Sequence, residues 1–132
     1  MRLSLSEVER AWLADPPRSL ARIATVDAHG MPHVVPGGWS YDAASGELVL
    51  GGRDVLRTRR ARHVRETGVA AVIIDGMAPG GPGWSPWAFQ ARGRARLDES
   101  AGTIRVSCDQ VTSWGLDAHI AATMTEPSSN PN

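Results

Sequence analysis

The chain has 132 residues with 14 basic and 14 acidic side chains, so its formal net charge is zero and its length allows one domain. All 14 basic residues are arginine. The lack of lysine excludes Schiff-base lysine catalysis and a phosphate-binding loop of the G-x-x-x-x-G-K-[ST] type. The neutral balance argues against a non-specific nucleic-acid-binding protein, which would carry an excess of basic residues.

The remaining composition predicts a cytoplasmic protein that binds neither nucleic acid nor a membrane. Cys108 is the single cysteine, so no internal disulfide can form, and a reducing compartment is the simplest expectation. The longest apolar run, residues 69–74, is far shorter than the about 20 residues of a membrane span. The first residues become charged too early for a signal peptide.

The chain opens with a predicted amphipathic helix, followed by short strands. A capping box can form at Ser4 or at Ser6, each with a glutamate three residues later, and the proline pair at residues 16–17 ends the helix. We expect strands over residues 20–26, 32–41, 47–50, 69–75, 87–97 and 103–111. Within the second, Pro36, Gly37 and Gly38 indicate an interruption: an edge, a bulge or the close approach of another group.

The fourth strand, residues 69–75, is a continuous β-branched run typical of a fully buried strand. Residues 53–66 lack a β signature and predict a central helix, and residues 76–83 have the composition of a loop. Six strands joined mainly by hairpins, with two helices, favour a small β-barrel over a βαβ sheet. We expect a single domain over residues 1–125 and a disordered tail over residues 126–132.

The densest feature is the arginine-rich segment, residues 53–65, which holds six of the 14 arginines and follows Gly51 and Gly52. On a continuous helix, Arg53, Arg57 and Arg60 would line one face. Glycines let a ligand approach the backbone, a helix N-terminus presents free N–H groups to an anion, and guanidinium groups bind phosphate bidentately. The segment therefore predicts a site for a phosphate or a carboxylate.

Two other interpretations of this segment stay open. It can be a solvated helix whose charge is balanced by Asp54 and Glu66, or a helix that binds nucleic acid. The zero net charge and the lack of aromatic residues nearby argue against the second.

The remaining polar residues form no recognisable catalytic set. His29 and His33 have no carboxylate or thiol at ligand spacing, so we expect no metal site. Ser40 and Ser85 lack the G-x-S-x-G motif, and Cys108 is expected to be a small buried residue. The five tryptophans are predicted to lie in the core or an interface, with stacking on a planar cofactor as the alternative.

The arginine-rich segment and four further segments, spread over residues 20–116, resemble a known family in order and spacing. They are similar to the pyridoxamine 5′-phosphate oxidase-like (PPOX class) split-barrel flavoproteins, and within these to the actinobacterial class that uses the deazaflavin coenzyme F420. The matching segments are residues 20–36, 51–65, 69–75, 90–95 and 104–116.

The resemblance implies a mainly β fold, a six-stranded split β-barrel of the FMN-binding type with a short N-terminal helix and a central helix. It implies a homodimer that binds F420 or FMN in a cleft between the protomers. The implied activity is that of an oxidoreductase, which delivers a hydride from the reduced cofactor to an activated C=C or C=N bond of a small organic substrate. A non-catalytic protein that binds or carries flavin, F420 or haem is the alternative.

The resemblance implies three groups of cofactor-binding residues and no catalytic residue. The phosphate would be held by Gly51, Gly52, Arg57, Thr58 and Arg60. The ring system would lie along Val35, Pro36, Gly38, Trp39 and Leu50. The partner protomer would cover the ring with Trp87 and Trp114. Solvent, His33, Tyr41 or Ser40 could supply the proton. The family commonly has lysine at the position of Arg60 and asparagine at that of His63.

Overall fold

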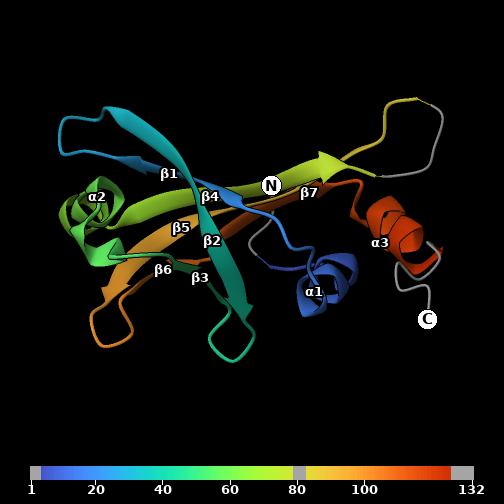
Figure 1. The fold of residues 1–132 in the computed structure, drawn as a ribbon, viewed down its shortest axis with the longest axis horizontal. Coiled ribbons are helices and arrows are strands. Elements are labelled where there is room, and N and C mark those ends of the chain that lie inside the picture. The colour runs from blue at the N-terminus through green and yellow to red at the C-terminus, as the bar shows by residue number, and fades with distance from the viewer. Residues whose placement is uncertain (1–3, 79–82, 126–132) are drawn as a thin grey trace.

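The computed structural model describes residues 4–78 and 83–125, which form a seven-stranded antiparallel sheet, three α-helices and a short 3-10 helix (Figure 1). In chain order the elements are α1 (Glu7–Ala14), β1 (Ala21–Val26), β2 (Pro32–Asp42), β3 (Glu47–Gly51), η1 (Val55–Arg57), α2 (Arg59–Thr67), β4 (Val69–Met77), β5 (Pro86–Asp98), β6 (Thr103–Ser107), β7 (Gln110–Trp114) and α3 (Leu116–Thr125). Figure 1 shows α2 at one end of the sheet and α1 with α3 at the other.

Six of the strands close into a barrel, and β2 forms one of its corners. The strands follow the order β4-β1-β2-β3-β6-β5, pairing between β4 and β5 closes the ring, and β7 is an extra strand on β5. β2 pairs with β1 as far as Gly37 and with β3 from Gly38 onward. The glycine pair lets the strand turn from one half of the barrel into the other. The strand is therefore not interrupted, whereas the close approach of another group is found at Gly37, where a Cβ would lie 2.8 Å from Cδ1 of Ile23.

The strand expected over residues 103–111 is two strands, because β5 is shared between two neighbours. Residues 88–92 of β5 pair with β7, and residues 95–98 pair with β6. A Cβ on Gly93, which lies between these stretches, would come within 2.3 Å of the carbonyl oxygen of Ser107. The break falls at Cys108 and Asp109, and the Asp109 carboxylate accepts hydrogen bonds from the backbone and the guanidinium of Arg94.

The predicted central helix is confirmed only in its second half. Residues 55–57 form the 3-10 helix η1, and α2 begins at Arg59 after an N-cap at Thr58. Asp54 has a left-handed backbone, with φ of 49°, which a continuous right-handed helix does not allow. Arg53, Arg57 and Arg60 therefore do not line one helix face.

One further expectation is corrected, one helix was not expected, and two expectations lie wholly or partly outside the described residues. β4 is not fully buried: Val72 and Ile74 face the core, whereas Val69 is 45% exposed. The helix α3 was not predicted. The predicted disordered tail lies outside the residues that the structure describes, as does the middle of the predicted loop over residues 76–83.

Aromatic side chains fill the end of the barrel covered by α1 and α3. Trp12, on α1, is 1% exposed and stacks on Trp39 and Phe89, with ring centroids 5.8 and 5.5 Å away. His119 of α3 accepts a hydrogen bond at its Nδ1 from the indole N–H of Trp12 at 3.0 Å. The capping box of α1 forms at Ser6, the second of the two predicted positions. The cofactor-binding residues expected from the sequence lie mostly away from this end.

Candidate functional site

Two facing glycines leave the backbone bare on the outer face of β2 and β3. Gly38 and Gly51 are direct partners across the two strands. No atom lies within 4 Å of the position that a Cβ would take on either residue. A flat group can therefore approach the peptide groups here more closely than side chains elsewhere on the sheet allow.

The residues expected along the cofactor ring divide between the two faces of the barrel. Pro36 and Gly38 are exposed on the outer face, beside the bare patch. Val35 and Trp39 alternate with them and pack against the core, and Leu50 is fully buried. The Trp39 indole N–H donates a hydrogen bond to the carbonyl of Ser19 at 2.9 Å. A ligand on the outer face would meet the strand backbone at these three inward positions rather than their side chains.

The loop after β3 forms one wall of a cavity of about 430 Å³ that is lined by Gly52, Arg57 and the β5–β6 turn at Ala101 and Gly102. Gly52 has φ of 140°, a conformation that side chains rarely adopt. This backbone places Arg57 on the cavity wall with its side chain exposed. A cationic group thus lies close to the end of the bare patch.

Arg60 reaches from α2 back to the middle of β2, at Gly37, and to Gly52, which follows β3. A Cβ built on Gly52 would lie 3.5 Å from Nη2 of Arg60, and one built on Gly37 would lie 3.9 Å from the same atom. The Nε of Arg60 is buried and has no hydrogen-bond partner among the described residues. A buried donor without a partner is costly in a folded protein, so an acceptor at this position would be stabilising.

The charge of the arginine-rich segment is not balanced by neighbouring carboxylates. None of its six arginines forms an ion pair with a described residue, and Asp54 and Glu66 pair with none of them. Elsewhere the arginines on the sheet do pair, as Arg94 does with Asp109. This contrast favours an anion site over the interpretation as a balanced, solvated helix.

Thr58 has a structural role that the sequence did not separate from ligand binding. Its hydroxyl donates to the carbonyl of Val55 at 2.6 Å and accepts from the backbone N–H of Ala61 at 3.2 Å. It therefore ends η1 and caps α2, and both directions of its hydroxyl are already occupied.

The two tryptophans expected to cover the ring lie in different surroundings. Trp87 is 5% exposed, stacks on His119 at a centroid distance of 4.2 Å and lies against Gly76, where a Cβ would be 2.6 Å from Cζ2. Trp114, on β7, is 48% exposed. The structure thus leaves Trp114 available to a second molecule and places Trp87 in the core of its own protomer.

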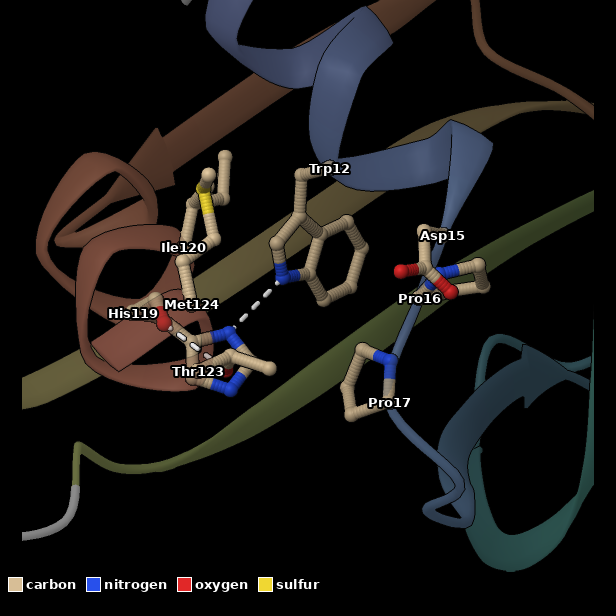
Figure 2. A pocket seen from close by; sticks show the side chains of 8 residues that line it. All are labelled: Trp12, Asp15, Pro16, Pro17, His119, Ile120, Thr123 and Met124. Atoms are coloured by element: carbon tan, nitrogen blue, oxygen red, sulfur yellow. Dashed lines mark hydrogen bonds between the residues drawn. The ribbon is translucent and has the colours of Figure 1, made fainter. Parts of the chain in front are cut away.

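The described residues line further cavities, among them one that includes Ser40, on the same face of β2 as Gly38. Figure 2 shows one between α1 and α3, where Trp12 and His119 form one wall and Pro17 and Met124 lie nearby. A second, of about 380 Å³, runs beside β2 and is lined in part by Arg18, Trp39 and Ser40. The third, at the start of α2, is lined by Arg59, Arg62 and two histidines, and the sequence did not reveal it because these residues come from distant segments.

The described residues contain no group of three or more histidine, cysteine or acidic side chains that could hold a metal ion. Within the same residues, no helix combines the length and the apolar character needed to cross a membrane.

Comparisons with known proteins agree with this barrel topology. No protein-family model matches the chain. The 5a,11a-dehydrotetracycline/5a,11a-dehydrooxytetracycline reductase of Streptomyces rimosus is 29% identical over 109 residues, which covers 76% of this chain and 77% of the relative. A FAD-binding protein from Mesorhizobium loti aligns with a TM-score of 0.61 and 18% identity, over 83% of this chain and 94% of that one. A FAD-binding protein from Mycobacterium smegmatis aligns with a TM-score of 0.58 and 19% identity, over 83% and 93% of the two chains. The chain thus shares the fold of these two FAD-binding proteins, which is consistent with the family expected from the sequence.

Proposed function

We propose that this protein is a reductase that binds reduced FMN or F420 on the outer face of β2 and β3. It would pass a hydride to an activated C=C or C=N bond of a small organic substrate. Two observations carry the proposal: the bare glycine pair, Gly38 and Gly51, and the buried, unpartnered Nε of Arg60, whose Nη2 lies near Gly52, the residue after Gly51. The likeness to a protein named as a reductase and to FAD-binding proteins supports the redox class.

The chain's own residues fit a cofactor that combines a flat ring with a phosphate. Arg57 and Arg60 carry charges that no carboxylate neutralises, and guanidinium groups bind phosphate through paired hydrogen bonds. The backbone of Gly38 and Gly51 would contact the ring without intervening side chains. FMN and F420 share both features, so these residues fit either cofactor.

When bound, the reduced cofactor supplies the hydride, and the protein supplies binding, orientation and protection from water. The backbone of β2 and β3 would shield one face of the ring. Ser40 lies on the same face of β2 as Gly38, two residues further on, and also lines the cleft that contains Arg18 and Trp39. We assign the acceptor substrate to this cleft, with Ser40 placed to relay a proton from solvent.

The other two groups considered for proton delivery are placed less well. His33 lines a different cavity, at the start of α2. Tyr41 alternates to the inner face, where burial raises the pKa of its phenol above the ordinary value. His33 thus does not line the substrate cleft, whereas Tyr41 lines it together with Ser40 but from the inner face of β2.

We also propose a homodimer in which the partner completes the cofactor site. Val34, two residues before Pro36 on the outer face of β2, is 65% exposed, and Trp114 is 48% exposed. Exposed apolar side chains on a sheet face are typical of a subunit interface. Val34→Glu should give a monomer in sedimentation experiments and weaken cofactor binding. A wild-type protein that sediments as a monomer at micromolar concentration would contradict this part of the proposal.

Titration of the purified protein with FMN and with F420, followed by absorbance, tests the binding site. Arg57→Gln and Arg60→Gln should each weaken binding by about tenfold or more, because each removes a charge-assisted contact to phosphate. Arg65→Gln is the matched control, since Arg65 is exposed on the last turn of α2 and lines neither cavity on this segment. Lack of binding to either cofactor, or equal affinities in all variants, would refute the proposed site.

Turnover distinguishes a reductase from a carrier. Reduced cofactor bound to the protein is mixed with a conjugated ketone, and cofactor oxidation and substrate reduction are measured together. Stoichiometric transfer supports the reductase. A protein that binds the cofactor but never oxidises it with an acceptor is a flavin, F420 or haem carrier.

A further inference from the structure

We propose that the cavity between α2 and the β1–β2 hairpin binds a small oxyanion, a carboxylate, phosphate or sulfate group, and that binding is coupled to proton uptake by a pair of histidines. The cavity has a volume of about 380 Å³, and its polar lining residues are Asp27, His33, Arg59, Arg62 and His63. It shares no lining residue with the cavity at Gly52 and Arg57, so this site does not depend on the proposed cofactor.

The positive charge of the cavity comes from α2. Arg59 and Arg62 are three residues apart, so they lie on the same face of the helix. Both side chains are exposed, and neither forms an ion pair with a described residue. Two unpaired guanidinium groups on one wall of a cavity are the donors that bind an oxyanion in proteins.

The histidines form the floor of the cavity and provide the proton-binding group. The rings of His33 on β2 and His63 on α2 meet edge to face, with centroids 5.4 Å apart and planes at 87°. His63 is 5% exposed, and its Nδ1 lies 2.9 Å from Oγ1 of the buried Thr25. The Nδ1 of His33 is buried and has no hydrogen-bond partner among the described residues.

Histidine changes its charge between about pH 5 and 8, and an anion held beside it would stabilise the charged form. Anion binding and protonation would therefore strengthen each other.

One acidic group opposes this charge, and its position is fixed. The Oδ1 of Asp27 accepts hydrogen bonds from the backbone N–H groups of Met31 and His29, both at 2.9 Å. The hydrogen bond from Met31 is the main cause of a lowered pKa of Asp27, with contributions from His29 and from His63. Asp27 therefore stays ionised and favours a protonated histidine nearby. The two arginines still leave the cavity with a positive balance.

Sulfate is the appropriate probe because it stays divalent at both about pH 5.5 and about pH 8.5, where histidine changes its charge. The cofactor-free protein is titrated with sodium sulfate at constant ionic strength, and imidazole NMR signals and binding heats are recorded. The signals of His33 and His63 should shift saturably. Sulfate should bind about tenfold more tightly at the lower pH.

Variants separate the roles of the lining residues. Arg59→Gln and Arg62→Gln should each weaken sulfate binding by about tenfold, whereas Arg65→Gln, outside the cavity, should not. The double variant His33→Gln/His63→Gln should retain sulfate binding but lose its pH dependence. The control His29→Gln removes an exposed histidine of the hairpin turn and should keep that dependence. Asp27→Asn should tighten sulfate binding, whereas it would weaken the binding of a cation.

Three results would each overturn the proposal: wild-type imidazole signals that do not shift with sulfate, affinities that are unchanged in both cavity arginine variants, or pH dependence that persists in His33→Gln/His63→Gln. The wild-type titration needs no variant to fold. FMN and F420 then serve as competitors. Displacement of sulfate identifies the ligand as an acidic group of the cofactor, and retention identifies it as a separate ion; both outcomes uphold an oxyanion site.

Discussion

A valine at position 38 tests whether a cofactor ring lies on the bare patch. Gly38→Val would place three carbons on the outer face of β2, where no atom lies within 4 Å of the Cβ position. The backbone at this residue does not have a positive φ, so a β-branched side chain suits the strand. Replacing a strand glycine in this way stabilises a protein by about 0.5–1 kcal/mol when nothing clashes.

The expected outcome is therefore a separation of folding from binding. The Tm of the cofactor-free protein should stay constant or rise by about 2–4 °C. The affinity for FMN and F420 should fall by at least about tenfold, because the new carbons occupy the space in which the ring would contact Gly38 and Gly51. Thermal unfolding by circular dichroism measures the first effect, and an absorbance titration measures the second.

A second glycine provides the contrasting control. In Gly76→Ala the new Cβ would lie 2.6 Å from Cζ2 of Trp87, so this variant should lose stability even without a cofactor. If Gly38→Val folds as expected and binds both cofactors with wild-type affinity, the ring does not lie on this patch and the argument from the bare glycines fails.

Three further predictions concern the scaffold. Phe89→Ala should lower the free energy of unfolding in urea by about 3–5 kcal/mol, because Phe89 is fully buried; a loss below about 1 kcal/mol would contradict the core assignment. Burial raises the pKa of Cys108 to about 11, so at about pH 8 its thiol should react with a disulfide reagent much more slowly in the folded than in the denatured protein; equal rates would contradict the stated cause. The hydrogen bond from Arg105 lowers the pKa of Asp42, and arginine hydrogen bonds lower that of Glu47 although its burial acts to raise it. A carboxyl group whose pKa is lowered in the folded protein stabilises the fold at pH values above its ordinary pKa. This stabilisation is lost as the pH falls through the lowered pKa, so the free energy of unfolding should decrease below about pH 4. Arg105→Gln should reduce this decrease, and pH profiles of equal slope would refute the assignment.

Local sequence patterns predicted the strands well because strand alternation depends on residues close together in the chain. In β5, Phe89, Ala91 and Ala95 face the core as the period of two predicts. The central helix was extended too far because arginine favours helix formation and residues 53–58 contain neither glycine nor proline. The left-handed backbone at Asp54 follows from the way the loop closes against the barrel, which no local pattern contains.

The site was predicted in outline but not in its division into faces. The glycines and arginines that follow β3 were recognised from composition and order alone. Because side chains alternate along β2, Val35 and Trp39 point into the barrel, whereas Pro36 and Gly38 lie on its outer face. The resemblance had assigned all four residues to the cofactor ring without this division. The burial of Trp87 agrees with the predicted core or interface position and not with the ring-covering role that the resemblance implied. Its stacking partner His119 lies in helix α3, which the sequence did not predict.

The arginine at position 60 and the glycines around it are best explained together. Lysine, which the resemblance to the split-barrel flavoproteins leads us to expect here, would carry the same charge, so charge alone does not account for arginine. A guanidinium is planar and has donors at fixed angles, whereas an ammonium is a compact point charge. Gly37 and Gly52 have no side chains at the positions next to the guanidinium of Arg60, so a broad, flat cation fits against both residues. Its buried Nε is then oriented by packing rather than by a hydrogen bond, which leaves the group available for an anionic acceptor.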